Sequence, residues 1–423
     1  MKIKVKEMSY EQVMRLPERK HHKPVRPNPL LRQLILTLSK GELRQVGFHC
    51  ERHGMERLAK GEPCLVLMNH SSFIDLKIAE TVMQDHPLNI ICTSDGMVGK
   101  EGLMRQVGCI PTNKFVTDVQ MVKDMVYALR ELKTSVLMYP EASYSFDGTA
   151  TPIPNSLGKC VRLLKVPVVV IRTHGAFLRD PLYNNLQLRD VQVSADVTYL
   201  LSTEEIGKLS AKDIQEKLNR CFAFDNFKEQ QEQQIPVREA FRADHLNRVL
   251  YQCATCKKEG HMQGVGTRII CKACGDQHEL TETGFLKNLF GRHTFTHIPD
   301  WYRWQREEVR KQLHDGSYAL DVDVEIYMLK DLKCIYKVGD GHLHHDDRGF
   351  YLEGCDGRLQ YGQTPKTSYS LYADYYWYEI GDMICIGDMQ CLYYCFPKDQ
   401  SRDVVAKTRI ATEELYKMNT IFA

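Results

Sequence analysis

Residues 46 to 225 alternate between short apolar runs and stripes of apolar residues at helical spacing, and this alternation constrains the fold more than any other feature of the 423-residue sequence. The short runs are those expected of strands buried on both faces, and each stripe predicts a helix that packs on them. Strands and helices in this order are typical of an α/β domain with a mainly parallel sheet flanked by helices. The predicted strands are 64–68, 88–92, 135–139 and 166–171, and the predicted helical segments are 74–83, 122–129, 157–164 and 203–222.

Four cysteines follow this domain as two C-x-x-C pairs, Cys253 with Cys256 and Cys271 with Cys274. The spacing is typical of a zinc ribbon in which four thiolates hold one Zn²⁺ ion. Two alternatives remain: the cysteines could form paired disulfides, or their spacing could arise by chance. We predict a structural Zn²⁺ site, because four thiolates leave no open position for catalysis. The flanking histidines, His261 and His278, are expected on the surface rather than among the ligands.

The last ~120 residues change to a period of two, which predicts β-strands. Apolar residues alternate with acidic ones from Leu320 to Met328, as in a half-buried strand. Gly-Asp turns separate further predicted strands, and a helix is predicted after Ser401. This pattern predicts a small β-rich domain, such as a barrel or sandwich of pleckstrin-homology-like type. Tyrosines and a tryptophan cluster at 372–378. The run 344–347, His-His-Asp-Asp, has metal-ligand chemistry, but we interpret it as a hydrophilic hairpin tip.

The N-terminal segment carries many basic residues and few acids from 15 to 34, and then an apolar stripe over 31–38. Such a segment can lie on an anionic membrane surface. The other interpretation is an ordinary helix packed on the core behind a solvated arm. Net charge is +2, so overall charge selects no partner.

No apolar run approaches the ~20 residues of a membrane-spanning helix, and no signal peptide is recognised at the N-terminus. Fifteen cysteines scattered among apolar residues favour a reducing compartment. We therefore expect a cytoplasmic protein, soluble or peripheral on the inner face of a membrane. The expected parts are an arm with an amphipathic helix (1–45), the α/β domain (46–228), a polar linker (229–247), the zinc ribbon (248–285), and the β-rich domain with its C-terminal helix (300–423).

The segment from Asn69 to Asp75 places a histidine, His70, five residues before an aspartate, directly after a predicted strand. Loops at strand ends are where α/β sheets usually carry their sites. Ser72 and Asp75 also fit a helix capping box, and the local pattern alone favours neither interpretation of Asp75.

Three further segments bring polar groups to strand ends: 108–114, which ends in Lys114, 139–145, which contains Glu141, and the strand 166–171. With Asn69, His70 and Asp75, they resemble in order and spacing the four blocks of the glycerolipid acyltransferase family, the glycerol-3-phosphate and lysophosphatidate acyltransferases. The resemblance covers roughly residues 46 to 225, and the cysteine pairs and the β-rich tail lie outside it.

The resemblance implies that His70 is a general base and that Asp75 orients it, which suits acyl transfer from a thioester to a hydroxyl. Neutral imidazole, with a pKa near ~6.5, can take the hydroxyl proton as the oxygen attacks. The residues implied to bind substrate are Asn69, Lys114, Glu141, Ser143, Tyr144 and Arg172.

This sequence departs from the family at the phosphate-binding positions. Lys114 and Tyr144 stand where arginines are usual, and Ala142 replaces a glycine. A tyrosine donates one neutral hydrogen bond, so phosphate affinity should fall or be supplied elsewhere, for which Arg172 and Arg179 are candidates. An acceptor whose head group is not a bare phosphate monoester would also fit.

The predicted partners are an acyl thioester donor (acyl-CoA or acyl-carrier protein), a lysophospholipid-type acceptor and a membrane surface, with no catalytic cofactor and no nucleic acid. The alternative hypothesis is a catalytically inactive lipid-binding or scaffold protein with a structural zinc ribbon, favoured by the altered third block and the two added modules.

Overall fold

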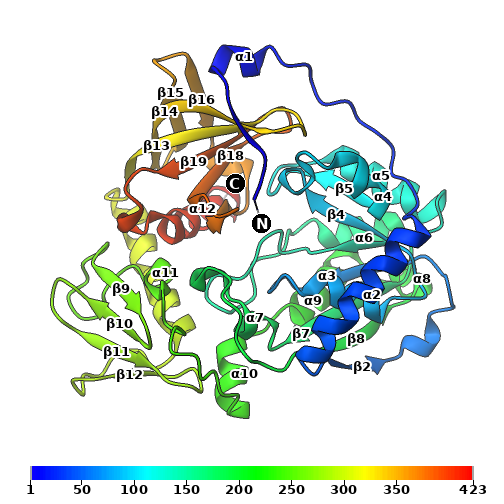
Figure 1. Ribbon diagram of the computed structural model, residues 1–423, viewed down its shortest axis with the longest axis horizontal. Helices are drawn as coiled ribbons and strands as arrows, with labels where there is room; N and C mark the ends of the chain where they lie inside the picture. The colour runs from blue at the N-terminus through cyan, green and yellow to red at the C-terminus, as the bar shows by residue number, and fades with distance from the viewer. Residues whose placement is uncertain (1, 422–423) are drawn as a thin grey trace.

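A seven-stranded sheet organises the first half of the computed structural model, which describes residues 2–421 (Figure 1). Its strand order is β2-β8-β7-β3-β6-β4-β5, and every neighbouring pair is parallel except β7 with β8. The mainly parallel sheet predicted from the sequence is therefore confirmed. The strands are β2 (His49–His53), β3 (Leu65–Met68), β4 (Leu88–Thr93), β5 (Cys109–Thr112), β6 (Ser135–Met138), β7 (Val168–His174) and β8 (Ser194–Leu201).

Helices cover both faces of this sheet, which is why its central strands are apolar on both sides. Helices α2, α3 and α4 pack on one face, and α5, α6, α8 and α9 pack on the other. Gly158 of α6 lies where a Cβ atom would meet the backbone oxygen of Ala211 at 2.2 Å, so the glycine permits close contact with α9. The helices are α2 (Pro29–Gln45), α3 (Asp75–Val82), α4 (Glu101–Val107), α5 (Val119–Arg130), α6 (Leu157–Leu164), α7 (Ala176–Arg179), α8 (Thr203–Lys208) and α9 (Ala211–Cys221).

The polar run 229–234, expected to be a surface linker, is instead mostly helical and forms part of α10 (Asn226–Gln233). Asp225 starts this helix by accepting a hydrogen bond from the backbone N–H of Lys228. The buried Gln230 side chain then donates to the backbone oxygens of Ile235 and Glu282. The run 229–234 has no apolar periodicity, so the sequence predicts neither the helix nor the long-range contacts of the Gln230 amide.

Four short antiparallel strands in the order β12-β11-β10-β9 form the cysteine-containing module. They are β9 (Met262–Val265), β10 (Arg268–Cys271), β11 (Gln277–Leu280) and β12 (Leu286–Asn288). His278, expected on the surface, is buried, because its ring packs edge-on against Trp301 and its Nε2 lies 2.6 Å from the Thr294 hydroxyl.

The C-terminal part is an antiparallel sheet, as the period of two predicted, with the strand order β16-β15-β14-β13-β19-β18-β17. Inward and outward residues alternate along the first half of β13, as the sequence suggested. The run 344–347 ends β14 and begins the next turn, but His345 within it is buried against Phe350. The strands are β13 (Leu320–Leu329), β14 (Ile335–Asp346), β15 (Gly349–Gly354), β16 (Leu359–Gln363), β17 (Tyr372–Trp377), β18 (Gly381–Gly387) and β19 (Leu392–Pro397).

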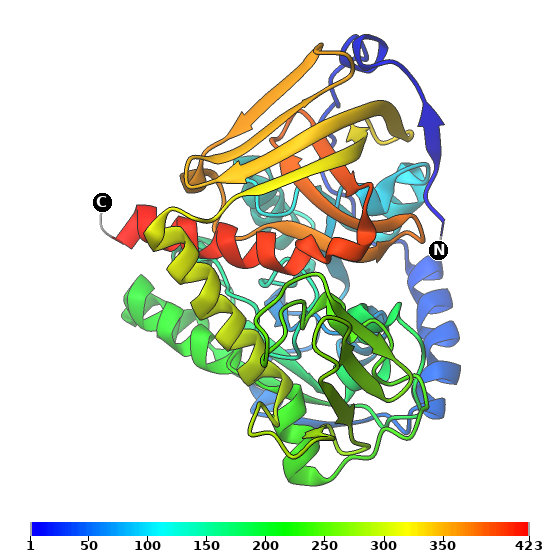
Figure 2. The same cartoon turned by 90° about the vertical axis from the view of Figure 1, so that its left-hand side faces the viewer.

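Two long helices, α11 (Ile298–Asp315) and α12 (Val404–Ile421), cross beneath this sheet (Figure 2). Their contact carries buried ion pairs from Arg306 to Glu413 at 2.7 Å and to Glu414 at 3.0 Å. Because α11 follows directly on the cysteine-containing module, these pairs link that module to the end of the chain.

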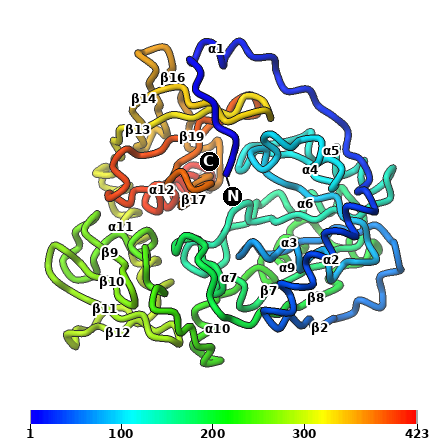
Figure 3. Tube along the Cα trace, viewed as in Figure 1, coloured from blue at the N-terminus to red at the C-terminus, as the bar shows by residue number. Residues whose placement is uncertain are grey.

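The N-terminal segment joins the two large parts of the molecule (Figure 3). Strand β1 (Val5–Glu7) pairs in parallel with β14, and α1 (Tyr10–Met14) follows it on the same sheet. The chain then crosses to the first sheet, where Arg19 donates to the Ser94 hydroxyl at 2.7 Å. The N-terminal segment ends in α2, which packs on α3.

One hydrophobic core is shared by all three parts. It contains Phe177 and Tyr183 of the first domain, Ile269 of the ribbon and Ile384 of the C-terminal sheet. The three parts therefore have a common buried interface. Within residues 2–421, no helix is at once long enough and apolar enough to cross a bilayer.

Candidate active site

His70 and Asp75 form a hydrogen-bonded pair in the turn between β3 and α3. The Nδ1 atom of His70 lies 3.0 Å from Oδ2 of Asp75. Because a carboxylate only accepts, this contact fixes the imidazole proton on Nδ1 and leaves Nε2 as the basic nitrogen. Within residues 2–421, Nε2 makes no hydrogen bond, and the ring lines a large cavity.

The Asp75 carboxylate also holds the turn, since Oδ2 accepts from the backbone N–H groups of Ser71 at 2.8 Å and Ser72 at 3.0 Å. The reciprocal capping box does not form as expected, because the Ser72 hydroxyl accepts from the N–H of Ile74. One carboxylate thus serves both the start of the helix and the orientation of the histidine.

Two tyrosines enclose the His70 ring. The ring centroids of Tyr139 and Tyr144 lie 4.2 Å and 4.0 Å from that of His70, both in stacked geometry. Burial lowers the pKa of His70 below its usual value, although the hydrogen bond to Asp75 opposes the shift. The imidazole is therefore neutral at pH 7, the protonation state that a general base needs.

The cavity beside His70 has a volume of about 1730 Å³ and lies between the first domain and the C-terminal sheet. The carboxyl ends of β4 and β5 and the loop after β6 form one wall, as is usual for sites in α/β sheets. The opposite wall comes from β17 and the loop before it, including Tyr372, Asp374 and Trp377. The cavity is large enough for a lipid-sized ligand, since small-molecule sites occupy roughly 300–1,000 Å³.

Lys114 points into this cavity from the segment after β5. Its Nζ lies 4.2 Å from the ring centroid of Tyr372 in the opposite wall. Burial lowers the pKa of Lys114, while the charges of Asp374 and Asp95 oppose the shift. The structure thus brings Lys114 into the same cavity as His70, together with Tyr144.

Glu141 and Ser143 are buried beneath the site and do not line the cavity. Glu141 accepts from the backbone N–H of His70 at 3.0 Å and from that of Thr151 at 2.7 Å. Burial raises its pKa to about 8, against these two hydrogen bonds. The contacts of Glu141 are those of a residue that holds the two loops together.

Asn69, Arg172 and Arg179 also lie outside the cavity lining. The Asn69 amide bonds Ser71 and Thr173 and so ties β3 to β7. Arg172 lies 3.8 Å from Glu229, and Arg179 pairs with Glu42 at 2.6 Å. The charges of both arginines are directed to protein carboxylates.

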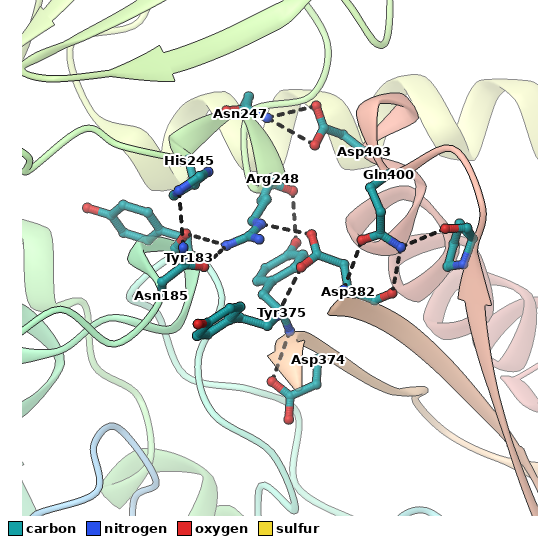
Figure 4. Close-up of polar contacts among 12 residues, drawn as sticks. Tyr183, Asn185, His245, Asn247, Arg248, Asp374, Tyr375, Asp382, Gln400 and Asp403 are labelled. Carbon is teal, nitrogen blue, oxygen red and sulfur yellow. Dashed lines mark hydrogen bonds and ion pairs between the residues drawn. The ribbon is translucent and has the colours of Figure 1, made fainter. Parts of the chain in front are cut away.

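A polar junction holds the C-terminal wall in place (Figure 4). Arg248 donates to Asp382 of β18 at 2.8 Å and to the backbone oxygen of Tyr183 in the first domain at 3.1 Å. The Tyr375 hydroxyl donates to the backbone oxygen of Arg248 at 2.8 Å, and Tyr375 itself lines the cavity. The segment that leads into the ribbon therefore connects the two walls.

Sequence reasoning did not find that β17 belongs to the site. The aromatic cluster 372–378 is the sequence signal that marks this strand. The sequence also does not predict the stacking of Tyr144 on His70; it shows only that Tyr144 stands where an arginine is usual.

The four cysteines lie together, with every pair of sulfurs within 4.8 Å. The Sγ atoms of Cys253 and Cys274 are 3.7 Å apart, as are those of Cys256 and Cys271. A tetrahedral site with Zn–S bonds of ~2.3 Å has sulfurs roughly 3.8 Å apart. The residues present therefore fit a four-thiolate metal site.

Residues 49–173 match the protein family described as Acyltransferase. This part of the chain is an acyltransferase-family domain, and it contains the His70–Asp75 pair and one wall of the cavity. Among solved structures, a match is the 1-acyl-sn-glycerophosphate (LPA) acyltransferase PlsC from Thermotoga maritima, with 15% identity over 44% of this chain and 79% of that chain. Its TM-score of 0.34 is too low to establish a common fold. No curated protein matches the sequence.

Proposed function

We propose that the protein is an O-acyltransferase that moves a fatty acyl group from acyl-CoA or acyl-carrier protein to a hydroxyl of a lysophospholipid-type acceptor in phospholipid biosynthesis. The observation that carries this proposal is the His70–Asp75 pair, whose free Nε2 faces a cavity of about 1730 Å³. This is the arrangement needed to activate a hydroxyl held in that cavity.

In the proposed reaction, the acceptor oxygen attacks the thioester carbonyl carbon while Nε2 of His70 takes its proton. Asp75 stabilises the imidazolium that forms, through Nδ1. The tetrahedral intermediate then collapses, the carbon–sulfur bond breaks, and the thiolate takes the proton back from His70. The products are an ester and a free thiol, and no cofactor or protein nucleophile is needed.

The test is thiol release from an acyl thioester by purified protein, which should depend on the acceptor. His70→Ala should reduce the rate about 100-fold or more. Its circular dichroism spectrum and thermal midpoint should match those of the wild type. Acylation by His70→Ala at the wild-type rate would contradict the role of His70.

The alternative is an inactive lipid-binding or scaffold protein, for which the loss of arginine at position 144 is the motivation. Lipid binding without turnover, across several thioesters and acceptors, would favour it. The intact geometry of His70 and Asp75 supports the enzyme instead, because a protein without turnover has no need of a free Nε2.

We propose further that the four cysteines hold one structural Zn²⁺ ion. The ion would fix the ribbon, whose Cys253 and Cys271 lie in the shared core. The strand order of the C-terminal sheet, followed by α12, supports a domain of pleckstrin-homology-like type.

A location on an anionic membrane surface, on the inner face of a membrane, is also part of the proposal. Leu30, Leu34 and Leu38 form a row on the outer side of α2, with 81%, 53% and 68% of each residue exposed. The arm before α2 carries exposed Lys20, Lys23 and Arg26. An apolar row beside basic residues suits the boundary between head groups and acyl chains.

Co-sedimentation with vesicles tests this location. The double variant Leu34→Glu with Leu38→Glu should lose binding to vesicles that contain anionic lipid. Leu188→Glu, a change at an exposed leucine outside α2, is the matched control. Equal binding of both variants would contradict a role for α2.

A further inference from the structure

The cavity beside His70 contains two opposite charges on facing walls. Lys114 comes from the acyltransferase domain, and Asp374 comes from β17 of the C-terminal domain. Tyr372 and Asp374 are two residues apart in an extended strand, so their side chains lie on one face. Since Lys114 stands over the Tyr372 ring, the three groups are neighbours.

Within the described residues the Asp374 carboxylate makes no ion pair, although the charge of Lys114 opposes the rise of its pKa. One of its oxygens accepts from the backbone N–H of Tyr375 at 2.9 Å (Figure 4). Within residues 2–421, no basic nitrogen lies within 4.0 Å of it, so even Lys114 stands further away. Burial raises the pKa of Asp374 to about 7. A half-buried carboxylate in a cavity wall, without an ion pair, is suited to receive a cation from a ligand.

The other carboxylate near Lys114 is already satisfied. Asp95 accepts from the Tyr372 hydroxyl at 2.6 Å and from Nε1 of Trp377 at 3.2 Å. Both donors are fixed parts of the C-terminal wall. Asp95 therefore has a structural role, and Asp374 is the carboxylate that remains for a ligand.

Asp374 is also close to the proposed reaction centre. Its charge raises the pKa of Tyr144, whose ring stacks on His70, and it opposes the lowering of the pKa of Lys114. Lys114 in turn acts on the pKa of His70. His70, Lys114 and Asp374 line one cavity, so a head group attached to a hydroxyl at His70 shares that cavity with both charges.

A phosphate monoester fits these charges poorly. It carries about −1.5 to −2 at pH 7 and is usually held by several cationic groups. Beside His70 the cavity offers Lys114, faced by Asp374 and Asp95, and position 144 is a tyrosine. The lysines Lys123, Lys159 and Lys366 also line the cavity, but they are exposed and belong to its solvent side. Lys417 lines it as well, and its Nζ is paired with Glu414 at 2.8 Å.

We propose that the acceptor's head group is zwitterionic, a phosphodiester that carries an amine, with the phosphate at Lys114 and the ammonium group at Asp374. The aromatic residues beside Asp374 in the same wall, Tyr376, Trp377 and Tyr378, supply the ring surfaces that ammonium groups favour. This inference rests on the proposed acyltransferase function and names its acceptor. It makes the C-terminal domain the part of the chain that selects the head group.

The first test compares acceptors with one acyl chain and three head groups: phosphoethanolamine, phosphoglycerol and phosphate. The wild type should show a kcat/KM at least about tenfold higher for the first than for the third, a difference of about 1.4 kcal/mol. Asp374→Asn should lower kcat/KM for the amine-bearing acceptor about tenfold more than for the phosphoglycerol acceptor. Asp347→Asn, an exposed carboxylate on the β14–β15 turn, is the control and should change neither.

The second test is independent of turnover. Calorimetry should detect glycerophosphoethanolamine binding to His70→Ala protein, and the double variant with Asp374→Asn should bind it about tenfold less tightly. Preference for the monoester, or an equal loss for all head groups in Asp374→Asn, would overturn the inference and leave the acyltransferase function standing. Amine-selective binding without any acylation would instead overturn the proposed function and support the head-group site.

Discussion

Tyr144 stacks on the imidazole of His70 with ring centroids 4.0 Å apart and an angle of 26° between the rings. Tyr139 covers the other side of the imidazole. The position where the family usually has an arginine thus holds a side chain that orients and shields the base. A tyrosine at this position, which we expect to weaken phosphate binding, also forms part of the surroundings of the histidine.

Replacing Tyr144 by alanine should lower kcat roughly tenfold, because the imidazole loses a stacking partner that holds its orientation. Water admitted to the site should also raise the pKa of His70, since burial is the main cause of its lowered value. The acid limb of the kcat/KM profile should then move to higher pH. Tyr144→Phe keeps the ring and should leave the limb in place; a shift in both variants would count against stacking as the cause.

Replacing Asp75 by asparagine should lower kcat about 100-fold or more, because an amide does not stabilise the imidazolium. An asparagine oxygen can still accept from Ser71 and Ser72, so the thermal midpoint should fall by only a few degrees. Steady-state kinetics and differential scanning calorimetry give the two values. Full activity with an unchanged thermal midpoint would contradict a catalytic role of Asp75 and leave it only the role of starting helix α3.

Binding of an amine-bearing acceptor should weaken as pH falls from 8 to 6. The pKa of Asp374 is raised to about 7, so the carboxylate is ionised above that pH and protonated below it. The ammonium group favours the ionised form, and KM should therefore rise as the pH falls through about 7. The phosphoglycerol acceptor should not show this rise, and its presence with both acceptors would point to another titrating group.

Removal of zinc should unfold the ribbon locally and disturb the parts that share its core. Freshly purified protein should contain one zinc per chain by atomic emission. Cys253→Ser or Cys271→Ser should lose the metal and lower the thermal midpoint on the order of 10 °C. Cys160→Ser, a half-buried cysteine in α6, is the control, and absence of zinc in wild-type protein would contradict the site.

Replacing Arg248 by alanine should destabilise the protein by about 3–5 kcal/mol, because it leaves the buried Asp382 without its partner. Urea unfolding measures this loss, and activity should fall with it, since the C-terminal wall loses its tie to the first domain. Arg358→Ala breaks surface ion pairs with Glu11 and Asp356 and should cost less than about 1 kcal/mol. Similar losses of unfolding free energy in both variants would show that the contacts of Arg248 contribute no more to stability than a surface ion pair.

Local patterns were sufficient for four central strands of the first sheet and for the proximity of His70 to Asp75. The apolar runs predicted the parallel sheet, the cysteine spacing predicted a sulfur cluster, and His70 and Asp75 are five residues apart in one turn. The facing wall could not be predicted, because contacts such as Tyr372 with Asp95 join residues 277 positions apart. No period or spacing in a single sequence encodes such a contact. The same limit hid the burial of His278, whose partners come from α11 and the segment before it.

The pairing of β1 with β14 has a consequence for biosynthesis. Val5 contacts Ile335, which stands some 330 residues later in the chain. At synthesis rates of roughly 5–20 residues per second, the first strand leaves the ribosome about 15 to 65 seconds before its partner. During that time the first domain can form its own sheet, while the N-terminal segment stays unpaired and open to chaperones. The second wall of the cavity, which comes from β17, is therefore made and positioned late in the folding of a newly made chain.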